Sequence, residues 1–119
     1  MDPVKLTRRL IDIESISGNE GAVGAELYDE LCRLDYTTHK MPVEHERFNV
    51  IATIDGRPPE IIFSTHMDTV PPFIPSSEDN DNIYGRGSCD AKAGPDKTGI
   101  VRGGCSVIAR PALAYCRTR

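Results

Sequence analysis

A histidine and an aspartate separated by one residue, His66 and Asp68, follow directly after an apolar run at residues 60–65. Residues i and i+2 of an extended chain point to the same side, so these two side chains can project together. An imidazole that binds a metal needs a fixed tautomer, and a nearby carboxylate is the usual partner that fixes it. A hydrogen-bonded histidine beside a turn aspartate gives the same pattern, so an isolated H-x-D leaves both interpretations open.

A second group of candidate residues lies in the segment 85–92, which reads GRGSCDAK. Gly85 and Gly87 let the backbone turn tightly and approach other groups closely, and Asp90 follows in a position to face inward. Taken alone, this segment is equally compatible with a surface loop. Cys89 has neither metal-ligand spacing nor a paired base, so we expect it to be a small buried apolar side chain.

Two helices are predicted before these segments. Asp2 followed by proline is typical of a helix start, and the apolar residues after it predict a helix over 3–14. Ser17 and Glu20 match a capping box, in which each side chain satisfies a backbone donor of the other residue. Apolar residues at helical spacing then predict a second helix from about 19 to 34.

Strands are predicted immediately before the candidate residues. Residues 48–54 form a β-rich run that ends in an Asp-Gly turn signal. Residues 60–65 contain a continuous Ile-Ile-Phe core, which suits a strand buried on both faces of a sheet. Three prolines and a polar stretch make 70–82 a loop. Helices followed by strands predict a layered α/β architecture, with the polar residues at a strand end.

Length and composition are those of a single globular domain. The chain has 119 residues, of which 39% are apolar and 27% charged. A net charge of -4 argues against nucleic acid as a main partner, and no apolar run reaches the roughly 20 residues that a membrane span needs. We found no signal-peptide pattern and therefore expect a cytoplasmic protein with free thiols. His39 and His45 lie among charged residues and are predicted to be solvated.

The last part of the chain differs in character from the rest. Residues 1–94 hold 17 acidic and 9 basic side chains, whereas residues 95–119 hold one acidic and five basic side chains. Glycines and a proline in this tail disfavour a helix. We therefore expect residues 95–119 to be poorly ordered and to add little to the core.

The two candidate segments, 64–71 (STHMDTVP) and 84–92 (YGRGSCDAK), together resemble the paired signature of a known family of zinc-dependent metallopeptidases and amidohydrolases. The family includes acetylornithine deacetylase, succinyl-diaminopimelate desuccinylase, carboxypeptidase G and aminoacylase. The resemblance runs from about residue 4 to residue 92 and includes LIDIESISG at 10–18. It implies an α/β fold: the N-terminal portion of a three-layer α/β/α zinc-hydrolase catalytic domain, truncated, with residues 1–94 as the partial catalytic domain.

The resemblance also implies roles for three residues. His66 would bind one zinc ion, Asp90 would bridge two zinc ions (cobalt being a possible substitute), and Asp68 would be the catalytic-site residue that orients His66. A water held between two such ions becomes a nucleophile near neutral pH, here toward the amide carbonyl of an N-acyl amino acid or peptide substrate. Full-length relatives are expected to be homodimers that bind neither nucleic acid nor membranes.

The family pattern is lost after Lys92. The family's general-base glutamate, its further acidic ligands and its C-terminal histidine have no counterpart here, so we expect no turnover by this chain alone. A shift of reading frame explains the abrupt change, and a divergent, disordered tail is the alternative. For function, the chain is interpreted as the N-terminal fragment of an acetylornithine deacetylase-like enzyme. The alternative is a catalytically silent paralogue that acts as a weak metal-binding or interaction module.

Overall fold

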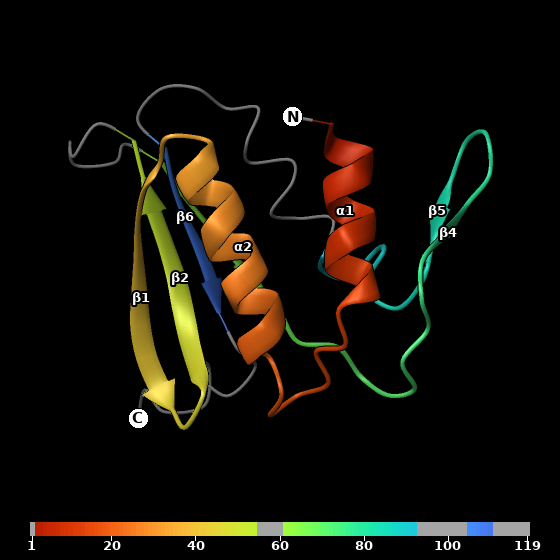
Figure 1. Cartoon of the computed structure of the whole chain (residues 1–119), viewed down its shortest axis with the longest axis horizontal. Helices are drawn as coiled ribbons and strands as arrows, with labels where there is room; N and C mark the ends of the chain where they lie inside the picture. The colour runs from red at the N-terminus through yellow and green to blue at the C-terminus, as the bar shows by residue number, and fades with distance from the viewer. Residues whose placement is uncertain (1, 55–60, 93–104, 111–119) are drawn as a thin grey trace.

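The computed structural model of the chain describes residues 2–54, 61–92 and 105–110. Two helices and six strands lie in this part of the chain (Figure 1). They are α1 (Pro3–Asp12), α2 (Gly21–Arg33), β1 (Thr37–Glu44), β2 (Arg47–Thr53), β3 (Ile61–His66), β4 (Ser77–Glu78), β5 (Ile83–Tyr84) and β6 (Cys105–Arg110). Both helices and both longer strands expected from the sequence are therefore present, with bounds that differ by a few residues.

The start of α1 confirms the predicted helix cap. The Asp2 carboxylate accepts hydrogen bonds from the backbone N–H groups of Val4 and Lys5, and Pro3 occupies the first helical position, where no N–H is needed. The capping box predicted for α2 is wrong. Glu20 precedes that helix without a side-chain cap, and the Ser17 hydroxyl donates to a residue far along the chain instead.

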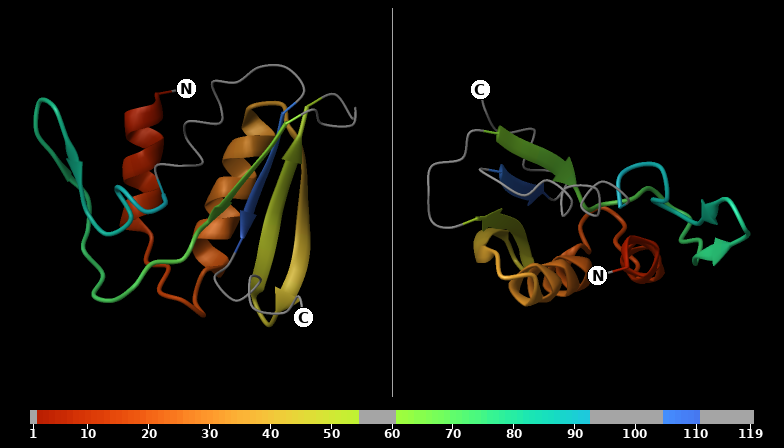
Figure 2. Two further views of the ribbon diagram at one scale, coloured as in Figure 1. Left: turned by 180° about the vertical axis from the view of Figure 1, so that it is seen from behind. Right: turned by 90° about the horizontal axis from the view of Figure 1, so that it is seen from above.

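The main sheet has four strands in the order β1-β2-β6-β3. β1 and β2 form an antiparallel hairpin, β6 runs antiparallel to β2, and β3 runs parallel to β6. α2 packs against β1 and β2, and α1 stands beside α2 (Figures 1 and 2). The β4–β5 hairpin extends from the far side of α1, and its first strand, β4, interrupts the segment 70–82 that was predicted to be loop.

One hydrophobic core joins the helices to the sheet. Its buried members come from both helices, from β2 and from the segment after β3: Leu6, Leu10, Val23, Leu27, Leu31, Val50, Ala52 and Met67. Burial of these side chains holds α1, α2 and the residues after β3 in fixed relative positions. The described residues therefore form an α/β fold with the end of β3 anchored in the core.

The expectation for the tail needs correction over Cys105–Arg110, because these six residues form β6 inside the sheet, between β2 and β3. The β-branched pair Val107-Ile108 favours a strand, which the change in charge and the glycines concealed. The remainder of 95–119 lies outside the described residues. The division into residues 1–94 and 95–119 stays a prediction.

The burial expected for β3 is wrong at one position. Ile62 is 58% exposed, although an Ile-Ile-Phe run was expected to be covered on both faces. In the described part of the chain, the two helices share one core, and no helix covers the opposite face of the sheet. None of the helices described is long and apolar enough to cross a membrane.

Candidate metal site

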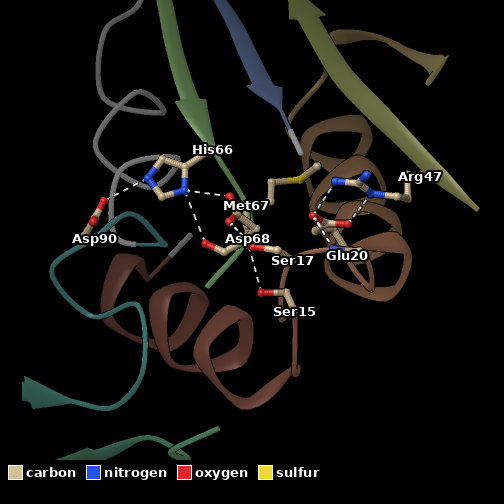
Figure 3. Close-up of polar contacts among 9 residues, drawn as sticks. Ser15, Ser17, Glu20, Arg47, His66, Met67, Asp68 and Asp90 are labelled. Atoms are coloured by element: carbon tan, nitrogen blue, oxygen red, sulfur yellow. Dashed lines mark hydrogen bonds and ion pairs between the residues drawn. The ribbon is translucent and has the colours of Figure 1, made fainter. Parts of the chain in front are cut away.

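His66 is the last residue of β3, and its ring lies between two carboxylates (Figure 3). Nδ1 is 3.0 Å from Asp68 Oδ1 and 3.3 Å from the Asp68 carbonyl oxygen. Nε2, on the other side of the ring, is 2.9 Å from Asp90 Oδ1. The structure thus brings together all three residues singled out from the sequence, across 24 positions of chain, at one end of the sheet.

Asp90 is carried by a compact turn whose glycines cannot be replaced without strain. Gly85 and Gly87 have φ values of +135° and +97°, which L side chains rarely adopt. A Cβ atom at Gly85 would lie 2.6 Å from Ile11 Cγ2. The Asp90 side chain itself is 85% exposed, and the peptide bond that follows it is cis. The tight turn presents a solvent-exposed carboxylate to Nε2 of His66.

Lys92 fastens this turn to the rest of the fold. Its ammonium group donates to the carbonyl oxygen of Ile13 at 2.5 Å, and its backbone N–H donates to Gly87 O at 2.9 Å. The side chain is only 2% exposed. Burial lowers the pKa of Lys92 to about 8, against an opposing effect of the negative charge on Asp12. This anchoring role of Lys92 was not predicted from the sequence, in which Lys92 is only the last residue of the motif at 84–92.

Hydrogen bonding constrains the tautomer of His66. The atoms facing Nδ1 are acceptors, and so is the Asp90 oxygen facing Nε2. Asp68 offers two acceptors to Nδ1 and its side chain is 12% exposed, whereas Asp90 offers one and is 85% exposed, so a neutral ring keeps its proton on the Nδ1 side. Burial lowers the pKa of His66. The hydrogen bond to Asp90 and the charges of Asp68 and Asp90 outweigh that effect, so the pKa lies above its ordinary value. The site thus favours a positive charge between Nε2 and Asp90.

Sequence reasoning missed Ser17 as a member of this site. Its hydroxyl donates to Asp68 Oδ2 at 2.7 Å, on the carboxylate oxygen not used by His66. The serine–glutamate spacing suggested a local helix cap, which concealed a contact 51 residues away. Ser17 lies in segment 10–18, which is part of the family resemblance. That resemblance was the one feature of the sequence that indicated a place for this segment near the site.

The buried position expected for Cys89 is wrong, because its side chain is exposed. It belongs to the lining of a pocket formed by His66, Asp68, Thr69, Val70, Gly85, Arg86, Gly87, Ser88, Cys89 and Asp90. Cys32 and Cys89 are free thiols, as expected, and His39 and His45 are exposed, as expected. Neither of these histidines belongs to the pocket.

A third metal ligand is missing from the described part of the chain. Among those residues, no group of three or more His, Cys, Asp or Glu side chains is arranged to hold a metal ion. A zinc site in a catalytic protein ordinarily has three protein ligands and one water. His66 and Asp90 therefore fit part of a metal site, with Asp68 as the orienting partner.

Comparison with known proteins agrees with this geometry. Residues 62–94, which hold all three site residues, match the model of peptidase family M20/M25/M40. A probable carboxypeptidase of Aspergillus fumigatus is 43% identical over 108 residues, covering 71% of this chain and 24% of its own. One of Emericella nidulans is 46% identical over 99 residues, covering 75% of this chain and 23% of its own. The chain thus spans about a quarter of the length of these curated relatives.

Solved structures of similar fold belong to the same class of enzyme. A tripeptidase from Staphylococcus aureus superposes with a TM-score of 0.72 at 20% identity, covering 94% of this chain and 36% of its own. A metallo-carboxypeptidase of the M20 family from Sulfolobus solfataricus gives a TM-score of 0.71 at 15% identity, covering 93% and 31%. The fold is therefore that of an M20 peptidase domain over about a third of its length. Residues 62–94 thus match the M20/M25/M40 peptidase family, and the chain is similar to part of the length of the relatives named above.

Proposed function

We propose that His66 and Asp90 are ligands of a zinc site, and that Asp68 orients His66 for this role. One observation carries the proposal. Nε2 of neutral His66 and Oδ1 of Asp90 are both electron-pair donors, yet they face each other at 2.9 Å. Such a pair repels unless Nε2 takes up a second ring proton or the two atoms share a metal ion. Two atoms that each bond zinc at about 2.0–2.2 Å are within reach of one ion at this separation.

The complete protein, by this proposal, is a zinc-dependent hydrolase that cleaves the amide bond of an N-acyl amino acid or a peptide. The carboxypeptidase names of the relatives favour a peptide, and an acetylornithine deacetylase-like substrate is the other member of the same reaction class. Zinc, two ions of it in the complete enzyme and with cobalt as a possible substitute, supplies Lewis acidity and activates water. His66 and Asp90 hold the metal, and Asp68 fixes the ring through Nδ1. Assembly as a homodimer belongs to the same proposal.

The chain by itself is proposed to bind metal without turning over substrate. A general base contributes about 10²–10⁴ in rate, and the family's glutamate for this role has no counterpart after Lys92. The missing third ligand in the described residues supports the second candidate function as well, that of a silent metal-binding or interaction module. Turnover of substrate by this chain would rule out both the inactive fragment and the silent module and would identify an active enzyme.

Zinc titration of the full 119-residue chain by calorimetry tests the metal site. We expect one zinc per chain, and large losses of affinity in His66→Gln, which removes the imidazole nitrogen, and in Asp90→Asn, which removes the carboxylate charge. His45→Gln is the matched control, because His45 is an exposed histidine outside the pocket. Equal affinity in all four proteins would show that zinc binds elsewhere.

A further inference from the structure

Ser17 is the residue of the site whose role neither the motif nor the family match assigns. We propose that Ser17 is a positioning residue: by holding Oδ2 of Asp68, it turns Oδ1 toward His66 and so selects the His66 tautomer that leaves Nε2 free. The hydroxyl lies 2.7 Å from Oδ2, and Oδ1 lies 3.0 Å from Nδ1 of the ring. The part of this inference that concerns zinc rests on the proposed function, whereas the part that concerns the tautomer does not.

The backbone places Ser17 independently of its side chain. Its N–H donates to Thr69 O at 3.3 Å, and the Thr69 N–H donates to Ser15 O at 2.8 Å. Ile16 forms a parallel β-bridge with Thr69. The residues around Ser17 are therefore joined to the residues around Asp68 by an isolated parallel β-bridge with two backbone hydrogen bonds. This pairing fixes the distance from the serine Cβ to the carboxylate before the hydroxyl bond forms.

A buried ion pair anchors the other end of this segment. Glu20 accepts the backbone N–H of Gly18 at 3.0 Å, and its two oxygens accept from Arg47 at 2.6 and 2.8 Å (Figure 3). Gly18 has φ of +100°, so the chain turns sharply directly after the serine. Ser17 is thus held between a β-bridge on one side and a fixed turn on the other. Its hydroxyl is presented to Asp68 from a rigid support.

A positioning role for Ser17 can be distinguished from a role in stability alone. Ser17 is exposed and the Asp68 side chain is 12% exposed, so water can take the place of the missing hydroxyl beside Oδ2. The Asp68 carboxylate, however, loses the bond that fixes its rotation. Ser15 is the matched control two residues away: it is fully buried, and its hydroxyl donates to the Met67 carbonyl at 2.8 Å, away from the carboxylate.

Nitrogen-15 NMR of the metal-free full-length chain tests the inference, with the pH raised until the ring signals of His66 no longer change and the imidazole is neutral. In the unsubstituted chain we expect the two His66 ring nitrogens to report protonated Nδ1 and unprotonated Nε2. Ser17→Ala should give a mixture of tautomers, and Ser17→Thr, which restores a hydroxyl at an exposed position, should return the original signal. Ser15→Ala should lower the unfolding midpoint and leave the tautomer unchanged.

Zinc calorimetry of the same variants adds the functional readout. Ser17→Ala should weaken zinc binding by about tenfold, the low end of the range for groups that orient a ligand. An unchanged tautomer in Ser17→Ala, or no recovery in Ser17→Thr, would overturn the positioning role. Absence of zinc binding in the unsubstituted chain, together with a tautomer change in Ser17→Ala, would overturn the proposed metal site and leave the positioning role intact.

Discussion

The ion pair between Glu20 and Arg47 should dominate the effect of single substitutions on the stability of this chain. The two side chains are 1% and 5% exposed and are joined by two hydrogen bonds of 2.6 and 2.8 Å. Arg47→Met removes both bonds and leaves a buried carboxylate without its charged partner, although the Gly18 N–H still donates to it. Breaking a buried pair in this way costs about 3–5 kcal/mol. A chain of this size has a total stability of roughly 6–18 kcal/mol, so the loss is a large share of it.

Urea unfolding followed by circular dichroism measures this loss. The double variant Glu20→Leu/Arg47→Met is the control, because it removes the unpaired charge as well as its partner. Replacement of a whole buried pair by apolar side chains is often neutral. We therefore expect the double variant to lie within about 1 kcal/mol of the original chain. A loss below about 1 kcal/mol in Arg47→Met, or a double variant as unstable as the single one, would refute the reasoning.

The same pair predicts a dependence of stability on pH. Burial raises the pKa of Glu20, but the hydrogen bond and charge of Arg47 and the Gly18 N–H outweigh it, so the pKa lies below its ordinary value of 4.5. A depressed folded-state pKa stabilises the protein above the unfolded pKa, and this stabilisation is lost as the pH falls through the folded value. The stability difference between the original chain and the Glu20→Leu/Arg47→Met variant should therefore shift in favour of the variant below about pH 4.5. A stability difference between the two proteins that stays constant down to about pH 3 would contradict the lowered pKa of Glu20.

Two further predictions concern the turn and the chemistry. Gly85→Ala should lower the free energy of unfolding in urea by about 1–3 kcal/mol more than Gly18→Ala does. Both glycines have positive φ, but only at Gly85 would the added Cβ lie 2.6 Å from a neighbouring side chain. Equal losses in the two variants would show that the turn is loosely packed. The full-length chain with zinc should hydrolyse N-acetylornithine and an N-protected dipeptide no faster than its His66→Ala/Asp90→Ala variant. The reason is that the family's general base has no counterpart and the described residues offer no third ligand. Turnover that a chelator abolishes and that the variant lacks would show that the chain is a complete catalyst.

The sequence predicted best where one local pattern had one structural solution. Asp2-Pro3 could do little other than start a helix, and the structure has that cap. The meeting of His66 and Asp90 followed from two motifs at strand ends, although neither motif alone distinguished a site from a loop. In these places, local chemistry and long-range packing agree.

The sequence predicted worst where a distant partner displaced a local one. Ser17 and Glu20 have the spacing of a helix cap, but Asp68 and Arg47 offer charged partners 51 and 27 residues away. Charge-assisted hydrogen bonds are roughly twice as strong as neutral ones, so the tertiary contacts prevail.

Edge and tail strands were missed for a different reason. β1 (Thr37–Glu44) is polar and mostly exposed and contains Pro42, so no alternating apolar pattern marks it. It exists because β2 supplies its hydrogen-bond partners. β6 was missed because the composition of the tail was read over 25 residues, whereas the strand occupies only six of them.

X-ray absorption spectroscopy at the zinc edge, on the full-length chain with one equivalent of zinc, tests the proposed metal site most directly. The account predicts a first coordination shell of one imidazole nitrogen and oxygen atoms at about 2.0–2.2 Å, with the imidazole signal absent in His66→Gln. Cys89 offers the sharpest alternative ligand, because it is an exposed thiol that lines the same pocket. A sulfur atom at about 2.3 Å, or a shell unchanged by His66→Gln, would contradict the assignment of His66 and Asp90 as the ligands.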